Sequence, residues 1–124
     1  MAKQGSNHAK KLGSWGEDHA QKWLEARGFE FVARNVSTEY GEIDLVMRKE
    51  NRLHFVEVKT RRTKQYGNPE DAITGTKLTH MVDSAQRFLQ QHPEYEGDWQ
   101  MDVLAIFVPS KSEAVEIRWF ENVS

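Results

Sequence analysis

Apolar residues recur at helical spacing in two stretches of the chain. Between residues 9 and 27, small and apolar side chains fall on one side of a helix. Gly28 follows them and is typical of a residue that ends a helix. A second apolar face predicts a helix from about 75 to 91, with Pro93 just beyond its end. Each helix therefore has one face that can pack against a sheet.

Short runs of β-branched, aromatic and aliphatic residues lie between and after these helices and predict strands. Polar segments separate them, and those at 36–41, 60–70 and 109–112 are expected to be loops or turns. The order α-β-β-β-α-β-β predicts an α/β sandwich with a central mixed sheet flanked by helices. The five predicted strands cover 29–35, 42–48, 53–59, 99–108 and 114–120.

The second and third predicted strands are expected to form an antiparallel hairpin. Glu50-Asn51 suits a two-residue turn, because Asn tolerates the left-handed backbone that such turns need. This turn places Leu45 opposite Val56, and the neighbouring apolar pairs on that face are expected to lie on the core. A register shifted by one residue would reverse the two faces. The apolar pairs of this face are Ile43 with Val58, Leu45 with Val56, and Met47 with His54.

The other face of the hairpin pairs Val46 with Phe55, Glu42 with Lys59, and Asp44 with Glu57. Two carboxylates directly opposite each other repel. A bound divalent cation, a raised pKa or exposure to solvent would relieve that repulsion. An exposed face with ordinary ion pairs is the alternative interpretation, and Val46 and Phe55 make the face too apolar for full exposure. Lys59 projects from the same face as Glu57 and can partly neutralise the pair.

Glu17 is a candidate for a third acid of the same site. It lies at the border of the apolar stripe of the first helix, from which it could point between helix and sheet. Ser14 and Glu17 also match a capping box, in which Glu17 would only stabilise the start of a helix. The pattern alone favours neither interpretation.

Composition adds limits to this picture. The 124 residues suit one domain, expected over 9–124 after a flexible tail at 1–8. The chain has no cysteine, no signal-like N-terminus and no apolar run long enough to span a membrane, so a cytoplasmic protein is expected. The net charge is −2, but residues 1–92 carry +3 and residues 93–124 carry −5. The five histidines show no zinc-ligand spacing.

The basic excess is concentrated just after Glu57, where four cations occur within six residues. Such a run is either a surface for phosphate groups or an ordinary solvated loop. Its members are Lys59, Arg61, Arg62 and Lys64.

Several motifs follow one another along the chain: Gly16-Glu17, GEIDLV at 41–46, FVEVKTR at 55–61, Gly67 before Pro69, Lys77, and DVLAI at 102–106. Taken together and in this order, they resemble the YraN family over roughly residues 12–123. The family comprises uncharacterised predicted nucleases of the restriction-endonuclease-like superfamily and is similar to archaeal Holliday junction resolvases. The resemblance implies a central mixed sheet flanked by helices, and Mg²⁺- or Mn²⁺-dependent hydrolysis of phosphodiester bonds.

The resemblance also implies roles for individual residues. The catalytic set would be Glu17, Asp44, Glu57 and Lys59. Independently of the resemblance, the charges and oxygen donors lead us to expect that Asp44, Glu57 and the backbone carbonyl of Val58 hold the metal. Ile43 stands where the superfamily often has proline. Arg61 and Lys77 match positions expected near the nucleic acid. The basic run adds Arg62 and Lys64 as expected contacts with backbone phosphates.

The sequence thus predicts a metal-dependent endonuclease, with DNA as the expected partner and branched DNA as one candidate substrate. A homodimer is an analogy with enzymes that cut branched DNA. A non-catalytic nucleic-acid-binding module on the same fold is the first alternative. A protein-interaction domain that uses the acidic C-terminal third is the second.

Overall fold

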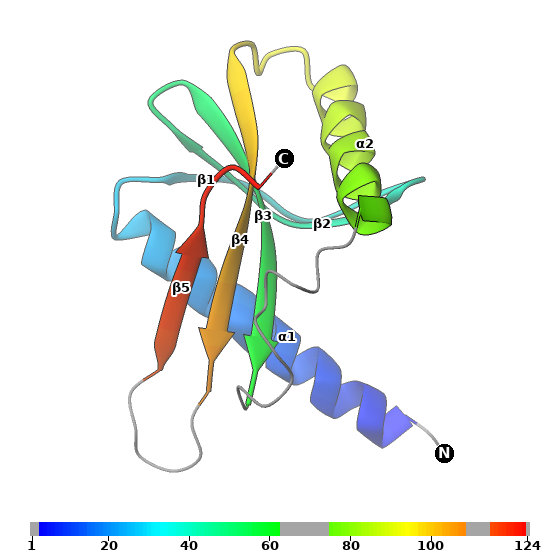
Figure 1. Cartoon of the computed structure of the whole chain (residues 1–124), viewed down its shortest axis with the longest axis vertical. Coiled ribbons are helices and arrows are strands. Elements are labelled where there is room, and N and C mark those ends of the chain that lie inside the picture. The colour runs from blue at the N-terminus through cyan, green and yellow to red at the C-terminus, as the bar shows by residue number, and fades with distance from the viewer. Residues whose placement is uncertain (1–2, 63–74, 109–114, 124) are drawn as a thin grey trace.

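The computed structural model describes residues 3–62, 75–108 and 115–123, with only the backbone described for residues 3–11. The order α-β-β-β-α-β-β is confirmed (Figure 1). None of the described helices is long and apolar enough to cross a membrane. The elements are α1 (Lys3–Glu25), β1 (Glu30–Thr38), β2 (Gly41–Lys49), β3 (Arg52–Arg61), α2 (Gly75–Gln91), β4 (Asp98–Phe107) and β5 (Glu116–Phe120).

The five strands form one mixed sheet in the order β1-β2-β3-β4-β5. Strands β3 and β4 are parallel, and the other three neighbouring pairs are antiparallel. Helix α2 lies between β3 and β4 in the chain, as expected where two parallel strands need a long connection. The predicted mixed α/β sheet is therefore confirmed.

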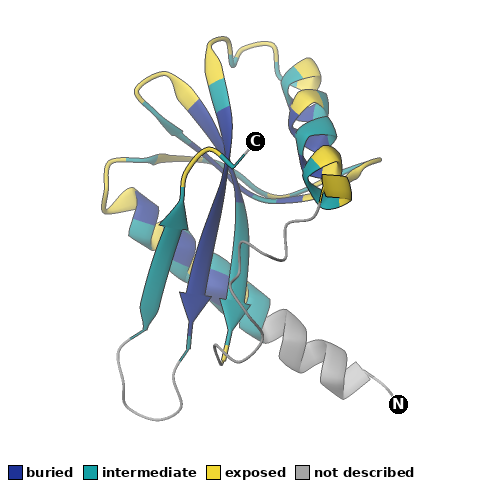
Figure 2. Cartoon of the chain, in the orientation of Figure 1, coloured by how far each residue is buried: buried dark blue, intermediate teal, exposed yellow. Residues whose placement is uncertain are grey.

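The two helices cover opposite faces of the sheet. Ala20 and Leu24 of α1 pack with Leu45 and Val56, whereas Phe88 of α2 packs in a second cluster that contains Val46 and Phe55. Alternate residues of a strand point to opposite faces, so α1 and α2 lie on different sides. Strand β4 is buried along nearly its whole length (Figure 2). The alternative of an open polar hairpin face is wrong, because α2 covers that face.

Helix α1 begins at Lys3, earlier than residue 9, so residues 3–8 of the expected tail are helical. Ser14 therefore lies inside the helix, and the capping-box interpretation of Glu17 is wrong. The end of the helix agrees with the prediction. The N–H of Phe29 donates to the carbonyl of Leu24 and that of Gly28 to Glu25, while Gly28 has a φ of 90°. This is the bond pattern of a Schellman motif, which satisfies the last carbonyls of a helix.

The predicted hairpin register is confirmed from Lys49 back to Leu45, which faces Val56. Glu50 and Asn51 both have positive φ, at 51° and 67°, as a two-residue turn of this kind requires. The boundaries of other segments differ slightly: residues 36–38 extend β1, and residues 60–61 extend β3. The rest of the loop expected at 60–70, apart from residue 62, and the turn at 109–112 lie outside the described residues.

The ladder between β2 and β3 ends at Leu45 and Val56. The predicted pairings of Asp44 with Glu57, Glu42 with Lys59 and Ile43 with Val58 are therefore wrong as ladder pairs. The side chain of Asp44 explains the change, because its Oδ2 accepts the N–H of Val58 at 2.9 Å. Ile43 accordingly packs in the α2-side cluster and not with Leu45.

Helix α1 crosses β3 in close contact at Gly16. A Cβ at this position would collide with the hydroxyl of Thr60. The absence of a side chain therefore lets the helix lie directly on the strand and sets how close Glu17 comes to the sheet.

We expect Gly16→Ala to lower the free energy of unfolding by about 1–3 kcal/mol, because overpacking outweighs the better helix propensity of alanine. Gly13→Ala is the matched control, since Gly13 lies in the same helix and a Cβ there meets nothing within 4 Å. The free energy of unfolding of Gly13→Ala should rise by up to about 1 kcal/mol. Urea denaturation measures both. Equal stabilisation by the two substitutions would contradict the close contact. Adding Thr60→Ala to Gly16→Ala should partly restore the free energy of unfolding.

Candidate active site

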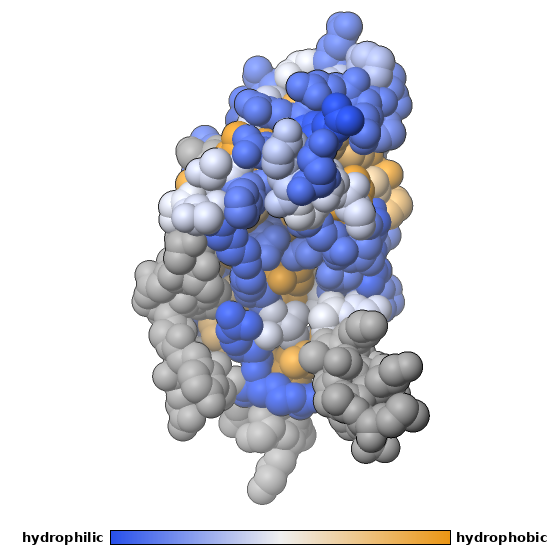
Figure 3. Space-filling model, turned by 90° about the vertical axis from the view of Figure 1, so that its right-hand side faces the viewer, coloured by the Kyte–Doolittle hydropathy of each residue, from blue (hydrophilic) through white to orange (hydrophobic). Residues whose placement is uncertain are grey.

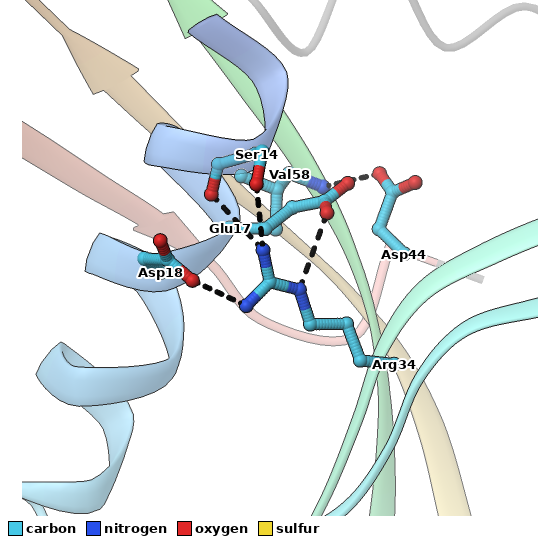
Figure 4. A network of polar contacts seen from close by, with 6 residues as sticks. All are labelled: Ser14, Glu17, Asp18, Arg34, Asp44 and Val58. Carbon is cyan, nitrogen blue, oxygen red and sulfur yellow. Dashed lines mark hydrogen bonds and ion pairs between the residues drawn. The ribbon is translucent and has the colours of Figure 1, made fainter. Parts of the chain in front are cut away.

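Three carboxylates meet where β2 separates from β3. Glu17 comes from the middle of α1, and Glu42 and Asp44 come from β2. One oxygen of each lies within 4.8 Å of the others. Figure 4 shows Asp44 turned toward Val58 of β3, with Glu17 approaching from α1.

Asp44 is the most strongly perturbed acid of this cluster. Burial raises its pKa from 3.8 to about 7, and the neighbouring Glu57 adds to that rise, whereas the hydrogen bond from the Val58 N–H opposes it. The carboxylate is thus held between two strands in a place where its negative charge is poorly compensated.

Glu57 lies beside Asp44 and forms ion pairs with two lysines. Its Oε1 is 3.2 Å from the Nζ of Lys59 on the same strand and 3.1 Å from the Nζ of Lys77 on α2. The side chains of Glu57 and Lys59 are only 12% and 16% exposed. Burial lowers the pKa of Lys59, and the adjacent Lys77 lowers it further. The site therefore has an acidic side and a cationic side.

Glu17 is held by Arg34 of β1. The Nε of Arg34 is 3.3 Å from Glu17, its Nη1 is 2.5 Å from Asp18, and its Nη2 donates to the carbonyl of Ser14 at 3.0 Å (Figure 4). Burial raises the pKa of Glu17, and the positive charge of Arg34 opposes that rise. One guanidinium therefore fixes the position of this acid against the sheet.

Asn35 supports the same cluster from β1. With its amide oriented to suit its neighbours, its nitrogen donates to both Glu17 and Glu42 at 3.1 Å. Its φ of 54° is left-handed, a conformation that Asn tolerates better than most residues. Asn35 therefore links the acid from the helix to one of the acids from the strand.

A cavity of about 320 Å³ gives access to the acids from the α2 side. Glu42, Asp44, Glu57 and Lys77 line it, together with residues of α2 and of the β1–β2 turn. Seen from the side on which α2 lies, the described surface is mostly hydrophilic, with hydrophobic residues in small patches (Figure 3). Glu42, Asp44 and Glu57 are thus accessible from this side.

The structure brings together the four residues predicted as catalytic: Glu17, Asp44, Glu57 and Lys59. Sequence reasoning missed Glu42 as a member of the acid cluster, although its spacing of two from Asp44 was a signal. It also missed Arg34, whose only signal was a charge within a mostly apolar strand. The metal-binding role of the Val58 carbonyl stays a prediction.

The residues predicted to contact nucleic acid are more dispersed. Arg61 is the last residue of β3, and Arg62 follows it at the surface. Lys64 lies outside the described residues. Lys77 is engaged with Glu57, so in this structure it belongs to the acid site.

The fold and these side chains define an α/β protein whose acidic and cationic groups meet between a helix and a split hairpin. The model of the uncharacterised protein family UPF0102, which is the YraN family of the sequence resemblance, matches residues 16–106. The chain belongs to this family. The match runs from the Gly16-Glu17 motif to the end of the motif in β4.

Individual relatives agree with that assignment. A UPF0102 protein of Syntrophomonas wolfei is 39% identical over 99 residues, which cover 80% of this chain and 86% of the relative. One from Caldicellulosiruptor saccharolyticus is 34% identical over 91% of this chain and 96% of the relative. One from Acinetobacter baumannii strain AYE is 34% identical over 92% and 94%. These names give membership of the family and no activity.

The pKa of Asp44 predicts how stability depends on pH. Between pH 4 and 7 the folded chain holds a proton that the unfolded chain has released. The free energy of unfolding should therefore fall as pH rises through this window, by at most about 4 kcal/mol. Urea denaturation in a chelating buffer measures the slope. Asp44→Asn should flatten it and be more stable than wild type at pH 8, and an unchanged slope in that variant would contradict the assignment.

Proposed function

We propose that this protein is an Mg²⁺- or Mn²⁺-dependent endonuclease that hydrolyses phosphodiester bonds of nucleic acid. The observation that supports it most is the meeting of the Glu17, Glu42 and Asp44 carboxylates, with Glu57 and its two lysines alongside. DNA is the proposed substrate, on the basis of the family resemblance.

The donor set fits a hard divalent cation. Mg²⁺ and Mn²⁺ prefer carboxylate oxygens, and here three come from two different elements. Two carboxylates no more than 4.8 Å apart repel by roughly 3 kcal/mol or more at an effective dielectric of 20. That repulsion exceeds the net gain of about 1 kcal/mol from an ordinary hydrogen bond. A cation between the acids would turn the repulsion into attraction.

Asp44 and Glu57 would hold the cation in this proposal, with Glu42 as an additional ligand. When bound, a divalent cation polarises a phosphate and lowers the pKa of a water molecule, which supplies the nucleophile for hydrolysis. Val58 fixes the direction of the Asp44 carboxylate through its N–H. Glu17, held by Arg34, would orient a water at the edge of the same cluster.

Lys59 would stabilise the negative charge that develops on the phosphate. Its amine is 3.2 Å from Glu57 and mostly buried, so its interactions are weakly screened by solvent. Lys77 of helix α2 also contacts the carboxylate of Glu57. The two lysines also fix the side chain of Glu57 in place.

Binding of the nucleic-acid backbone is assigned to the end of β3. Arg61 and Arg62 lie a few residues beyond the acids and would contact phosphates, which gives affinity without sequence specificity. A backbone that follows β3 from these arginines would pass the acid cluster.

Metal binding is the first test. Mn²⁺ at millimolar concentration should raise the melting temperature of the wild-type protein, because a ligand of the folded state stabilises it. The gain should increase as pH rises toward 8, since the ligands must lose their protons. Asp44→Asn should abolish it. Glu25→Gln removes an exposed acid of the same helix that carries Glu17 and should behave as wild type. A wild-type protein that no divalent cation stabilises would contradict the proposal.

Cleavage is the second test. With Mn²⁺, wild-type protein is incubated with linear, nicked, flapped and four-way DNA, and with RNA of the same sequences. Glu57→Gln should reduce the rate by at least about 100-fold, as expected when a group of the reacting centre is lost. Equal activity of the variant would assign the cleavage to a contaminant or another site. Binding by both proteins without cleavage by either would favour the non-catalytic binding module.

A further inference from the structure

A second cavity lies on the α1 side of the sheet, where α1 ends and β2 turns into β3. Its volume is about 690 Å³, within the range of about 300–1,000 Å³ typical of small-ligand sites. His54 of β3 contributes to its lining. Because His54 and Glu57 are three residues apart on one strand, they point to opposite faces of the sheet. This cavity is therefore distinct from the acid cluster.

The floor of the cavity carries a chain of hydrogen bonds. Arg52 donates to the Oε1 of Gln100 at 2.8 Å, and the Nε2 of Gln100 donates to the Oδ1 of Asp102 at 2.8 Å. The Nδ1 of His54 lies 2.6 Å from the Oδ2 of Asp102. Asp102 is fully buried, and His54 is 6% exposed. Gln100 and His54 are therefore fixed in place before any ligand arrives.

This series of hydrogen bonds determines which ring nitrogen of His54 is available to a ligand. The Oδ1 of Asp102 accepts from Gln100 and from the N–H of Asn122, both at 2.8 Å, so this group acts as an acceptor. A carboxylate that only accepts requires the proton on the Nδ1 of His54. The Nε2 of His54 is then the ring atom left available to a ligand, and no described residue hydrogen-bonds to it. A buried imidazole thus presents an unused polar atom in the lining of the cavity.

The walls of the cavity are aromatic. Trp23, Phe29 and Trp119 line it, and the two indoles stack with ring centroids 5.8 Å apart and planes 30° apart. The guanidinium carbon of Arg27 lies 3.5 Å from the ring centroid of Trp23. Aromatic faces and guanidinium planes are the surfaces on which unstacked bases pack.

The charges of the lining select among aromatic ligands. Three cations and three acids surround the cavity, and one pair of them, Arg52 and Asp98, is 3.3 Å apart. This balance gives no net attraction for a polyphosphate. A purely apolar ring would leave the buried Nε2 of His54 without a partner, which is unfavourable. A planar ring with polar edges satisfies both the walls and the floor.

We propose that this cavity binds a single purine or pyrimidine base, stacked on its aromatic wall and hydrogen-bonded by His54. The base comes either from a free nucleoside or from an unstacked position in a nucleic-acid strand. Neither source requires hydrolysis at the acid cluster, so the inference stands apart from the proposed nuclease activity.

The test is calorimetric titration of the wild-type chain with adenosine, guanosine, cytidine and thymidine, and with a short single-stranded DNA. Trp119→Leu should weaken binding by at least about fivefold, the lower end for loss of one stacking surface. Trp99→Leu is the matched control, because Trp99 packs in the α2-side cluster and should leave binding unchanged. Arg27→Met changes an exposed residue and should also weaken binding, which covers the case in which Trp119→Leu fails to fold.

Each outcome separates the sources or overturns the proposal. Binding of nucleosides that depends on Trp119 and Arg27 identifies a free base as ligand, and binding of the strand alone identifies a base within nucleic acid. Asp44→Asn should bind the nucleosides as wild type does, because Asp44 does not line this cavity, so loss of cleavage in that variant says nothing against the cavity. The proposal is overturned if neither ligand binds at millimolar concentration, if binding ignores both substitutions, or if tryptophan amide binds as tightly as the nucleosides.

Discussion

The carboxylate of Asp44 replaces a backbone hydrogen-bond acceptor between β2 and β3, and the geometry of the site depends on this replacement. Its Oδ2 accepts the N–H of Val58, and the regular ladder stops at Leu45. The hairpin opens there into a space that Glu17 enters from α1 and that Glu57 borders from β3. A continuous ladder would have buried the same residues as ordinary cross-strand pairs.

Three different elements keep the acids close despite their repulsion. Arg34 and Asn35 of β1 bind Glu17, while Lys59 and Lys77 bind Glu57. The cations Arg34, Lys59 and Lys77 neutralise acids at the edge of the cluster, whereas Asp44 at its centre accepts the N–H of Val58 and forms no ion pair with a described residue. Burial raises the pKa of Asp44 to about 7, and repulsion by the neighbouring Glu57 adds to that rise. An arrangement of this kind favours a cation at the centre.

The two faces of the sheet carry two different candidate sites. Strand β3 presents Glu57 and Lys59 toward the α2 side and His54 toward the α1 side. The α1-side cavity has a fixed imidazole, stacked indoles and balanced charge, whereas the acid cluster has an excess of carboxylates. One strand therefore connects a candidate site for phosphodiester chemistry with a candidate site for a base.

The sequence by itself determined the order of elements, the Glu50-Asn51 turn, the register near it, and four of the residues that meet at the site. Local rules suffice for these, because helix periodicity, turn conformations and strand alternation act over a few residues. Only the tertiary structure decided that the ladder ends at Leu45, that Glu42 joins Glu17, and that Arg34 holds that acid. Those outcomes depend on how closely α1 crosses β3 at Gly16 and on which polar groups lose water there. No local pattern encodes such contacts between residues distant in the chain.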